Sequence, residues 1–281
     1  MSDSAKRILL VKCKDQVGLI HSITGLLLEK ACNILSNHEF VEPLESIFFM
    51  RTEFSGQLAE VDLKNRLVQI LPENAEIQIH KVKKQKIILF ATKESHCLGD
   101  ILLRHRAREL DVDIECVLAN HSTLQSLVED FHLPFHCISN DGISREEHEI
   151  KILDFLAKHT FDFLVLAKYM RILSPEFVSR FPERIVNIHH SFLPAFVGAS
   201  PYQQAYDRGV KLIGATAHFV TSSLDEGPII AQDVISVDHS YTKDKLVLNG
   251  RDIEKVVLAR ALRFVFEHRV LVWNNKTVIF K

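Results

Sequence analysis

The chain has 281 residues, of which 47% are hydrophobic, and its formal net charge at pH 7 is −2. This length is sufficient for two domains, and the composition is typical of packed globular cores. The balanced charge argues against nucleic acid or a membrane surface as a partner. The sequence contains neither an apolar run near the roughly 20 residues of a membrane helix nor a signal-peptide pattern at its start, so we expect a cytoplasmic protein.

The five cysteines do not indicate a redox or metal framework. Their number is odd, their spacing is wide and they form no C-x-x-C pair, which predicts neither disulfides nor a thiolate zinc site. We expect most of them to be small, buried, hydrophobic side chains. The positions are Cys13, Cys32, Cys97, Cys116 and Cys137.

The first part of the chain predicts a small α+β domain. Helical spacing of Leu19, Ile23, Leu26 and Leu27 supports its first helix. The expected elements are a strand over 6–13, a helix over 19–31, strands over 34–41 and 46–54, a helix over 58–71 and a strand over 76–82. This β-α-β-β-α-β order is that of a ferredoxin-like domain.

The basic stretch KVKKQK, residues 81–86, marks the domain boundary, either as a linker or as a solvated strand end. We therefore expect domains over 1–84 and 85–281. Strands then alternate with helices, which predicts a doubly wound α/β domain. The expected strands are 87–91, 114–118, 135–138 and 163–166, and the expected helices are 98–109, 124–131 and 146–158.

A polar cluster follows the next expected strand, residues 184–188, within RIVNIHHSFLPAF. Asn187 and His189 lie at the carboxyl end of this strand, which is where open α/β sheets bind ligands. A second polar segment, GATAHFVTSSLDEGPIIAQ, contains His218 in a strand and Asp225 in a loop. The cluster is therefore expected to be an active site.

These side chains are the groups needed for attack on a carbonyl. An Asn amide can donate to a developing oxyanion, a His can move a proton near neutral pH, and an Asp can orient the His or a water molecule. The sequence lacks the G-x-S-x-G motif of a serine nucleophile. Direct attack by water or an amine is therefore favoured over an acyl-enzyme.

Each residue also has a purely structural interpretation. His190 could be a satisfied polar group at a strand end, His218 a core histidine, and Asp225 only a turn residue. The sequence contains fifteen histidines, which are common metal ligands, but it lacks the H-E-x-x-H spacing of a zinc site. The adjacent His189 and His190 would also point to opposite sides of an extended segment. We therefore predict no metal site.

The segments N-I-H at 187–189 and S-F-L-P at 191–194, with Gly198, His218 and Asp225, resemble the signature of the folate-dependent formyltransferase family. The resemblance covers residues 86–281. It implies that Asn187, His189 and Asp225 are catalytic. It further implies that the folate is held by Met170, Arg171, Ile172 and Leu173, with His218, and more weakly Gln232, in support.

The HHSFLPAF form and the N-terminal domain narrow the resemblance to the hydrolytic branch of that family. The implied reaction is hydrolysis of 10-formyltetrahydrofolate to formate and tetrahydrofolate, catalysed by a hydrolase of a linear amide C–N bond. The folate is then the substrate, with no separate cofactor, and the reaction supplies formate and balances one-carbon folate pools.

Two alternatives stay open at this point. A formyltransferase would pass the formyl group to an amine, although the glycine-free loop over 92–97, with Glu94, argues against a phosphorylated acceptor. A regulatory binding protein would hold folate without turnover, but it would not need Asn187, His189 and Asp225 together.

The first domain resembles an ACT domain, a ferredoxin-like regulatory module. This resemblance implies an amino-acid effector at the turn from Asp15 to Gly18 and a homo-oligomer formed through ACT domains. Alternatively, the domain is only an oligomerisation surface.

Overall fold

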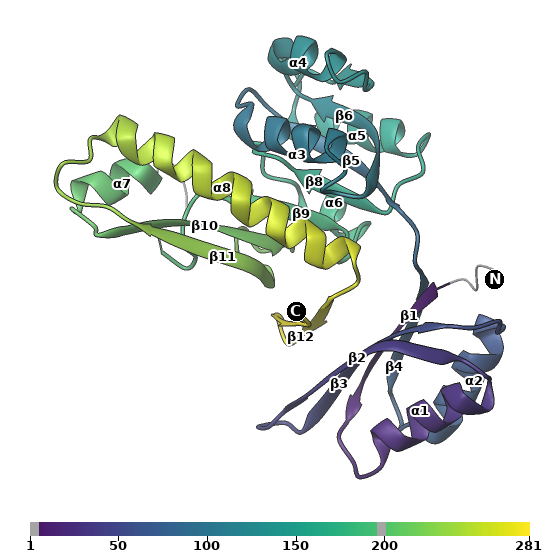
Figure 1. Ribbon diagram of the computed structural model, residues 1–281. Helices are drawn as coiled ribbons and strands as arrows, with labels where there is room; N and C mark the ends of the chain where they lie inside the picture. The colour runs from purple at the N-terminus through teal and green to yellow at the C-terminus, as the bar shows by residue number, and fades with distance from the viewer. Residues whose placement is uncertain (1–5, 196–200) are drawn as a thin grey trace. The chain divides into compact units, whose positions relative to one another are not determined.

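The computed structural model describes residues 6–195 and 201–281. Contacts divide the chain into two units (Figure 1). The first contains residues up to Lys83 together with 267–273 and 278–281, and the second contains 84–266 and 274–277. The expected division at 84/85 differs from this one by assigning Lys84 to the first domain and the C-terminal residues 267–273 and 278–281 to the second.

The first unit begins with the expected β-α-β-β-α-β order. The elements are β1 (Lys6–Lys14), α1 (Leu19–Glu29), β2 (Asn33–Glu42), β3 (Ile47–Ser55), α2 (Glu60–Ile70) and β4 (Glu76–Lys81). The four strands form an antiparallel sheet in the order β2-β3-β1-β4. This arrangement confirms the predicted ferredoxin-like α+β fold.

The central strands of this sheet are buried on both faces. On one face, Leu9 and Val11 of β1 pack against α1 and α2. On the other face, Ile8 and Leu10 pack with Phe49 and with the C-terminal residues Leu271 and Phe280. The C-terminal hairpin, β12 (Val270–Trp273) and β13 (Lys276–Ile279), therefore supplies part of this core.

A buried arginine fixes the segment that leads into the hairpin. Arg51 of β3 is 3% exposed, and its Nε donates to the carbonyl of His268 at 3.1 Å. Its Nη2 donates to the carbonyl of Glu267, also at 3.1 Å. These carbonyls follow a helix end, where backbone acceptors lack intrahelical partners, so Arg51 satisfies them.

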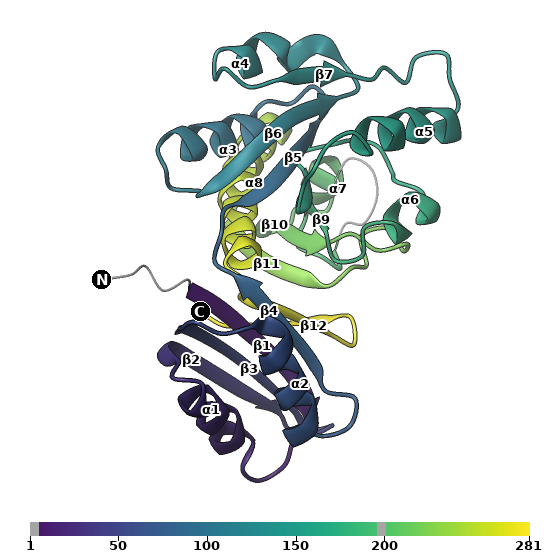
Figure 2. The same ribbon diagram turned by 90° about the vertical axis from the view of Figure 1, so that its right-hand side faces the viewer.

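The second unit is built around a seven-stranded sheet (Figure 2). Its elements are β5 (Gln85–Ala91), α3 (His96–Arg106), β6 (Val112–Ala119), the 3-10 helix η1 (Ser122–Leu124), α4 (Gln125–Glu129), β7 (Phe135–Cys137), α5 (Arg145–Leu156), β8 (Phe163–Leu166), α6 (Pro175–Ser179), β9 (Ile185–His189), α7 (Pro201–Asp207), β10 (Leu212–Phe219), β11 (Ile229–Ser236) and α8 (Lys243–Phe266). The strand order is β11-β10-β9-β8-β5-β6-β7, with β10 and β11 antiparallel to their neighbours. The other strands are parallel, which confirms the doubly wound α/β fold.

Helices cover both faces of this sheet. Helices α5 and α6 pack on one face, whereas α8 packs along β9, β10 and β11 and contacts α3. Strands β6 and β7 lie on one side of β5, whereas β8 and β9 lie on the other side. The strand order therefore reverses between β5 and β8, and ligands of such folds usually bind at this reversal. In the described part of the chain, none of the helices combines the length and apolar character of a membrane span.

The structure confirms that most of the cysteines are buried. Cys13, Cys32, Cys97 and Cys116 are buried, whereas Cys137 is exposed.

The packing of the C-terminal hairpin on the first unit predicts a stability effect. Leu271→Ala should lower the free energy of unfolding of this unit by about 2–5 kcal/mol, because it removes a buried side chain and leaves a cavity. Leu44→Ala is the matched control, since Leu44 is 90% exposed and should change stability by less than about 0.5 kcal/mol. Urea unfolding followed by Trp273 fluorescence reports on this unit, because Trp273 contacts Phe49 and is the single tryptophan. Equal effects of the two substitutions would contradict this role of the hairpin.

Candidate active site

The site is built on the pairing of β9 with β10. In this antiparallel register His218 lies opposite Asn187, and Thr216 lies opposite His189. The amide Nδ2 of Asn187 donates to Nε2 of His218 at 3.2 Å, and Nδ1 of His218 donates to the carbonyl of Phe219 at 2.9 Å. A carbonyl only accepts, so the proton of a neutral His218 lies on Nδ1. Burial lowers the pKa of His218, and the neutral form is therefore favoured.

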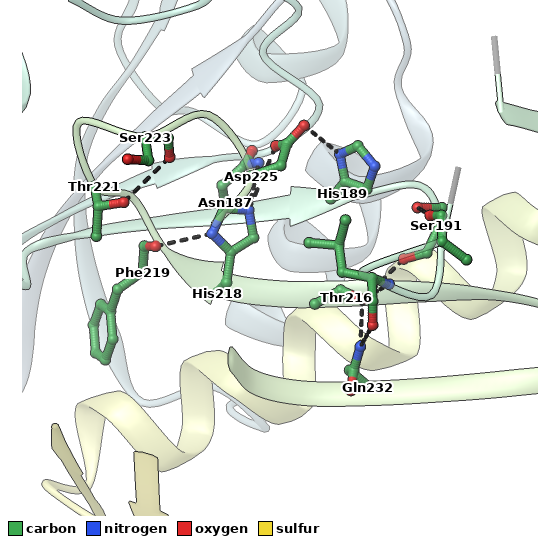
Figure 3. Close-up of polar contacts among 12 residues, drawn as sticks. Asn187, His189, Ser191, Thr216, His218, Phe219, Thr221, Ser223, Asp225 and Gln232 are labelled. Carbon is green, nitrogen blue, oxygen red and sulfur yellow. Dashed lines mark hydrogen bonds and ion pairs between the residues drawn. The ribbon is translucent and has the colours of Figure 1, made fainter. Parts of the chain in front are cut away.

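Asp225 reaches the two histidines from the loop between β10 and β11 (Figure 3). Its Oδ2 lies 3.2 Å from Nδ1 of His189, and its Oδ1 lies 3.8 Å from Nε2 of His218. Burial alone would raise the pKa of Asp225, but the hydrogen bond from His189 and the charges of the histidines together lower it. The ionised carboxylate therefore holds the proton of His189 on Nδ1.

The loop that carries Asp225 has a constrained backbone. Asp225 has φ 57°, in the left-handed region that few non-glycine residues adopt. At Gly227 a Cβ would lie 1.8 Å from the carbonyl oxygen of Phe219, so only glycine fits. Such strain is often found at functional sites. The D-x-G segment is therefore a turn that also delivers a carboxylate to the site.

The second ring nitrogen of His189 is buried without a partner. His189 is 5% exposed, and its Nε2 accepts or donates no hydrogen bond among residues 6–195 and 201–281. Buried polar atoms are nearly always paired. Because His189 lines a pocket, this nitrogen is positioned to contact a bound molecule.

The pocket has a volume of about 430 Å³. It brings together Asn187, His189, His218 and Asp225 with the segment 168–173. Its further lining residues are Leu166, Ile188, His190 and 220–224. The residues predicted to be catalytic or to hold the folate, apart from the weaker candidate Gln232, are therefore gathered around one cavity of a size that suits a small-molecule ligand.

The segment Met170–Leu173 forms an apolar wall of this pocket. Met170 and Ile172 are 55% and 56% exposed, so both offer apolar surface to a molecule bound in the pocket. The backbone N–H of Met170 donates to Oγ1 of Thr92 at 3.0 Å. At the other end, the N–H of Ser174 donates to the carboxylate of Glu149 at 2.7 Å. These two contacts fix the wall to β5 and α5.

The expectation that His189 and His190 point to opposite sides is wrong. Their rings are stacked, with centroids 5.1 Å apart and an angle of 25° between the planes. The reason is that β9 ends at His189, so His190 lies in a bend and leaves the alternation of the strand. Burial, followed by the charge of Lys168, lowers the pKa of His190 to about 3. His190 is therefore a neutral imidazole that lines the pocket.

The loop after β9 is held by two polar side chains from β10 and β11. Thr216 Oγ1 donates to the carbonyl of Ser191 at 2.8 Å and accepts from the N–H of Leu193 at 3.0 Å. Gln232 Nε2 donates to Thr216 Oγ1 and to the carbonyl of Leu193. Gln232 therefore supports the loop and does not line the pocket. Gly198, the remaining motif residue, lies outside the described residues.

A buried ion pair beside the pocket was not predicted. Lys168 lines the pocket, and its Nζ lies 3.0 Å from the carboxylate of Glu254 in α8. Helix α8 was not among the predicted elements. A usable signal was present, because Glu254 interrupts an apolar stripe of Ile253, Val257 and Leu258 at helical spacing.

His96, Cys97 and Glu254 bring potential metal ligands within 4.8 Å of one another. The ammonium of Lys168 already contacts this carboxylate. Burial, together with the charge of Glu254, raises the pKa of the Cys97 thiol and favours its protonated form. The carboxylate of Glu254 is therefore already engaged by a cation, and these side chains form an ion-pair cluster.

Asp15 and Gly18 lie in the first unit, in the exposed turn between β1 and α1. Gly18 has φ 92°, which favours glycine, and it precedes the first residue of α1.

Comparison with known proteins places this site in a family. The family model for formyl transferase matches residues 85–262, more than half of the chain. A glycinamide ribonucleotide transformylase from Symbiobacterium toebii has a similar structure, with a TM-score of 0.68 and 27% identity over 74% of this chain and 99% of that one. The chain therefore belongs to the formyl transferase family.

More similar proteins cover both units. The formyltetrahydrofolate deformylase of Haemophilus influenzae is 50% identical over 98% of this chain and 99% of its own length. That of Bacillus subtilis is 41% identical over 97% of this chain and 93% of its own length. A crystal structure of a formyltetrahydrofolate deformylase from Pseudomonas syringae pv. tomato has a TM-score of 0.94 and 39% identity over 100% of this chain and 96% of that one. Within the formyl transferase family, the chain belongs to the formyltetrahydrofolate deformylases.

The neutral His190 predicts a specific pH dependence of stability. An unfolded histidine takes up a proton below about pH 6.5, whereas folded His190 does so only near pH 3, so acid between these values favours the unfolded state. His190→Gln should therefore lose less thermal stability than the wild type between pH 7 and pH 5. His239→Gln, at an exposed position, is the control and should follow the wild type. Identical melting profiles for wild type and His190→Gln would contradict the assignment.

Proposed function

We propose that this chain hydrolyses 10-formyltetrahydrofolate to formate and tetrahydrofolate, with Asn187, His189 and Asp225 as the catalytic residues. The observation that carries the residue assignment is the buried Nε2 of His189, which lines the pocket without a partner among the described residues. The full-length similarity to formyltetrahydrofolate deformylases supports the substrate.

The oxygen of the formyl group would lie between Asn187 and His189. As water attacks the carbonyl carbon, negative charge develops on this oxygen, and N–H donors placed there stabilise it. The amide of Asn187 is one donor. Nε2 of His189 would become the second once it has accepted the proton that the attacking water loses, and the carboxylate of Asp225 at 3.2 Å from Nδ1 would stabilise the resulting imidazolium.

The proton balance sets the remaining roles. Water gains a bond to the formyl carbon and loses a proton, and the bond from carbon to N10 then breaks as N10 is protonated. Asp225 and His189 together accept the first proton and return one to N10, which is general acid–base catalysis by a coupled pair. His218 orients the Asn187 amide through the 3.2 Å contact.

The pocket wall supports the proposed binding of the folate. Met170, Arg171, Ile172 and Leu173 would hold the pterin ring, and their position between Thr92 and Glu149 keeps this wall rigid. The reaction needs no separate cofactor, since the folate itself is the substrate. Transfer to an amine is not favoured, because relatives similar over nearly the whole chain are named deformylases.

We also infer a regulatory role for the first unit. Its ferredoxin-like sheet supports an ACT assignment, with an amino-acid effector bound near Asp15 and Gly18. Homo-oligomerisation through this unit belongs to the same proposal. Binding of individual amino acids by the wild type and by Asp15→Ala, measured by calorimetry, tests the effector site, and equal affinities would remove Asp15 from it.

Substitution of the three residues should stop formate release. With no amine acceptor present, His189→Ala and Asp225→Asn should lower kcat by about 10²–10⁴-fold, and Asn187→Ala by about 10²–10³-fold. Asp225→Asn should still bind tetrahydrofolate, because the change preserves the shape of the side chain. Formate is measured directly after mixing with 10-formyltetrahydrofolate.

The matched controls are His239→Ala and Asp244→Asn, which change exposed residues of the same types and should keep wild-type activity. If wild-type protein released no formate and instead formed an N-formylated product once an amine was added, the chain would be a transferase. Unchanged turnover in Asp225→Asn would remove Asp225 from the mechanism.

A further inference from the structure

A carboxylate is completely buried next to the pocket. Glu254 of α8 is 0% exposed, and both of its oxygens accept hydrogen bonds. Oε1 accepts from the hydroxyl of Tyr202 at 2.6 Å. Oε2 lies 2.8 Å from Nε2 of His96 and 3.0 Å from Nζ of Lys168. A buried charge is stable only with such partners.

The donors to this carboxylate come from three distant parts of the chain. His96 begins α3, Lys168 follows β8, and Tyr202 lies in α7. Although burial alone would raise the pKa of Glu254, the hydrogen bond from His96, the charge of Lys168 and the hydrogen bond from Tyr202 lower it to about 2. Glu254 is therefore an anion at neutral pH, surrounded by donors.

The helix that carries Glu254 is shaped for this contact. One turn earlier, a Cβ on Gly250 would lie 2.0 Å from the hydroxyl oxygen of Tyr202. Glycine is unfavourable inside a helix, but here it lets the Tyr202 ring approach closely enough to reach Glu254. The packing of this helix is therefore adapted to the contact between Tyr202 and Glu254. We refer to His96, Lys168, Tyr202 and Glu254 as the Glu254 cluster.

The Glu254 cluster adjoins the catalytic groups. Lys168 lines the pocket with Asn187 and His189, and its backbone has φ 62°, a strained conformation for lysine. His190 is influenced by the charges of both Lys168 and Glu254. The cluster lies where β5 and β8 end, at the edge of the sheet where ligands of doubly wound folds bind.

An ammonium, an imidazole and a hydroxyl around one point are the chemistry that recognises a phosphate or a carboxylate. We propose that Glu254 is an internal anion that occupies this position, and that its presence excludes amine acceptors bearing a phosphate and leaves water to attack the formyl group. This inference rests on the proposed hydrolysis. Glu254 is thereby a specificity-determining residue that does not touch the reacting atoms.

A second carboxylate, that of Glu94, lies next to the Glu254 cluster and supports the proposed exclusion of phosphate. Oε2 of Glu94 lies 3.6 Å from Nδ1 of His96 and 3.1 Å from Nη2 of Arg251. The ring of His96 thus has a carboxylate on each side. Lys168 is paired with Glu254, and Arg251 is paired with Glu94, so a phosphate dianion that approached this cluster would find both cations already neutralised by carboxylates.

The test is to remove the carboxylate of Glu254 by substitution and to supply inorganic phosphate in its place. Titration calorimetry with inorganic phosphate should detect no binding to wild-type protein up to about 10 mM, whereas Glu254→Ala should bind phosphate at least about tenfold more tightly, because Lys168 is left unpaired. Glu254→Asp, which keeps a carboxylate, is the matched control and should resemble the wild type. Glu254→Ala combined with Lys168→Met should lose the gained binding.

A kinetic readout separates specificity from structure. With O-phosphoethanolamine or ethanolamine present, Glu254→Ala should divert formyl groups to the phosphorylated amine more than to the unphosphorylated one, and the wild type should yield formate with both. If Glu254→Ala is poorly folded, phosphate should restore its melting transition, as a ligand of the native state does.

The inference is overturned if folded Glu254→Ala binds phosphate no better than the wild type, if phosphate fails to restore a poorly folded variant, or if the two amines react equally. Absence of formate release by the wild type would instead refute the proposed hydrolysis, whatever phosphate binding is seen.

Discussion

The antiparallel pairing of β10 with β9 is the constraint on which the site depends. This register sets His218 opposite Asn187 and brings the loop after β10 over the end of β9. A shift of one residue would move every side chain of β10 to the other face of the sheet. The Asn187 amide would then lose its contact with His218, and Asp225 would no longer reach His189. The geometry of the chemistry is therefore set by backbone pairing.

Two carboxylates of the second unit, the buried Glu254 and the half-buried Asp225, lie in different environments. Glu254 is fully satisfied by three donors and has no contact with the reacting atoms. Asp225 is bonded to His189, whose other nitrogen is unpaired among the described residues. A saturated network rigidifies its surroundings, whereas an incomplete one leaves binding capacity for a ligand. The first carboxylate thus holds Lys168 beside the site, and the second is placed to support the reaction.

Sequence patterns predicted the two folds and the chemical cluster because both depend on local order. Asn187 and His189 could be found because they end a strand, and Asp225 because its spacing from His218 resembles the formyltransferase signature. Long-range contacts were not predictable in this way. Leu271 and Phe280 complete the core of the first unit from the end of the chain, and the stacking of His190 depends on where β9 stops. Glu254 needs donors separated by up to 158 residues.

The most direct test of the central claim is a crystal structure of Asp225→Asn with bound 10-formyltetrahydrofolate, which slow turnover in this variant should preserve. The account predicts that the formyl oxygen lies within hydrogen-bond distance, about 2.7–3.2 Å, of Nδ2 of Asn187 and Nε2 of His189, with the pterin against the segment 170–173. A formyl group bound away from both side chains would contradict it.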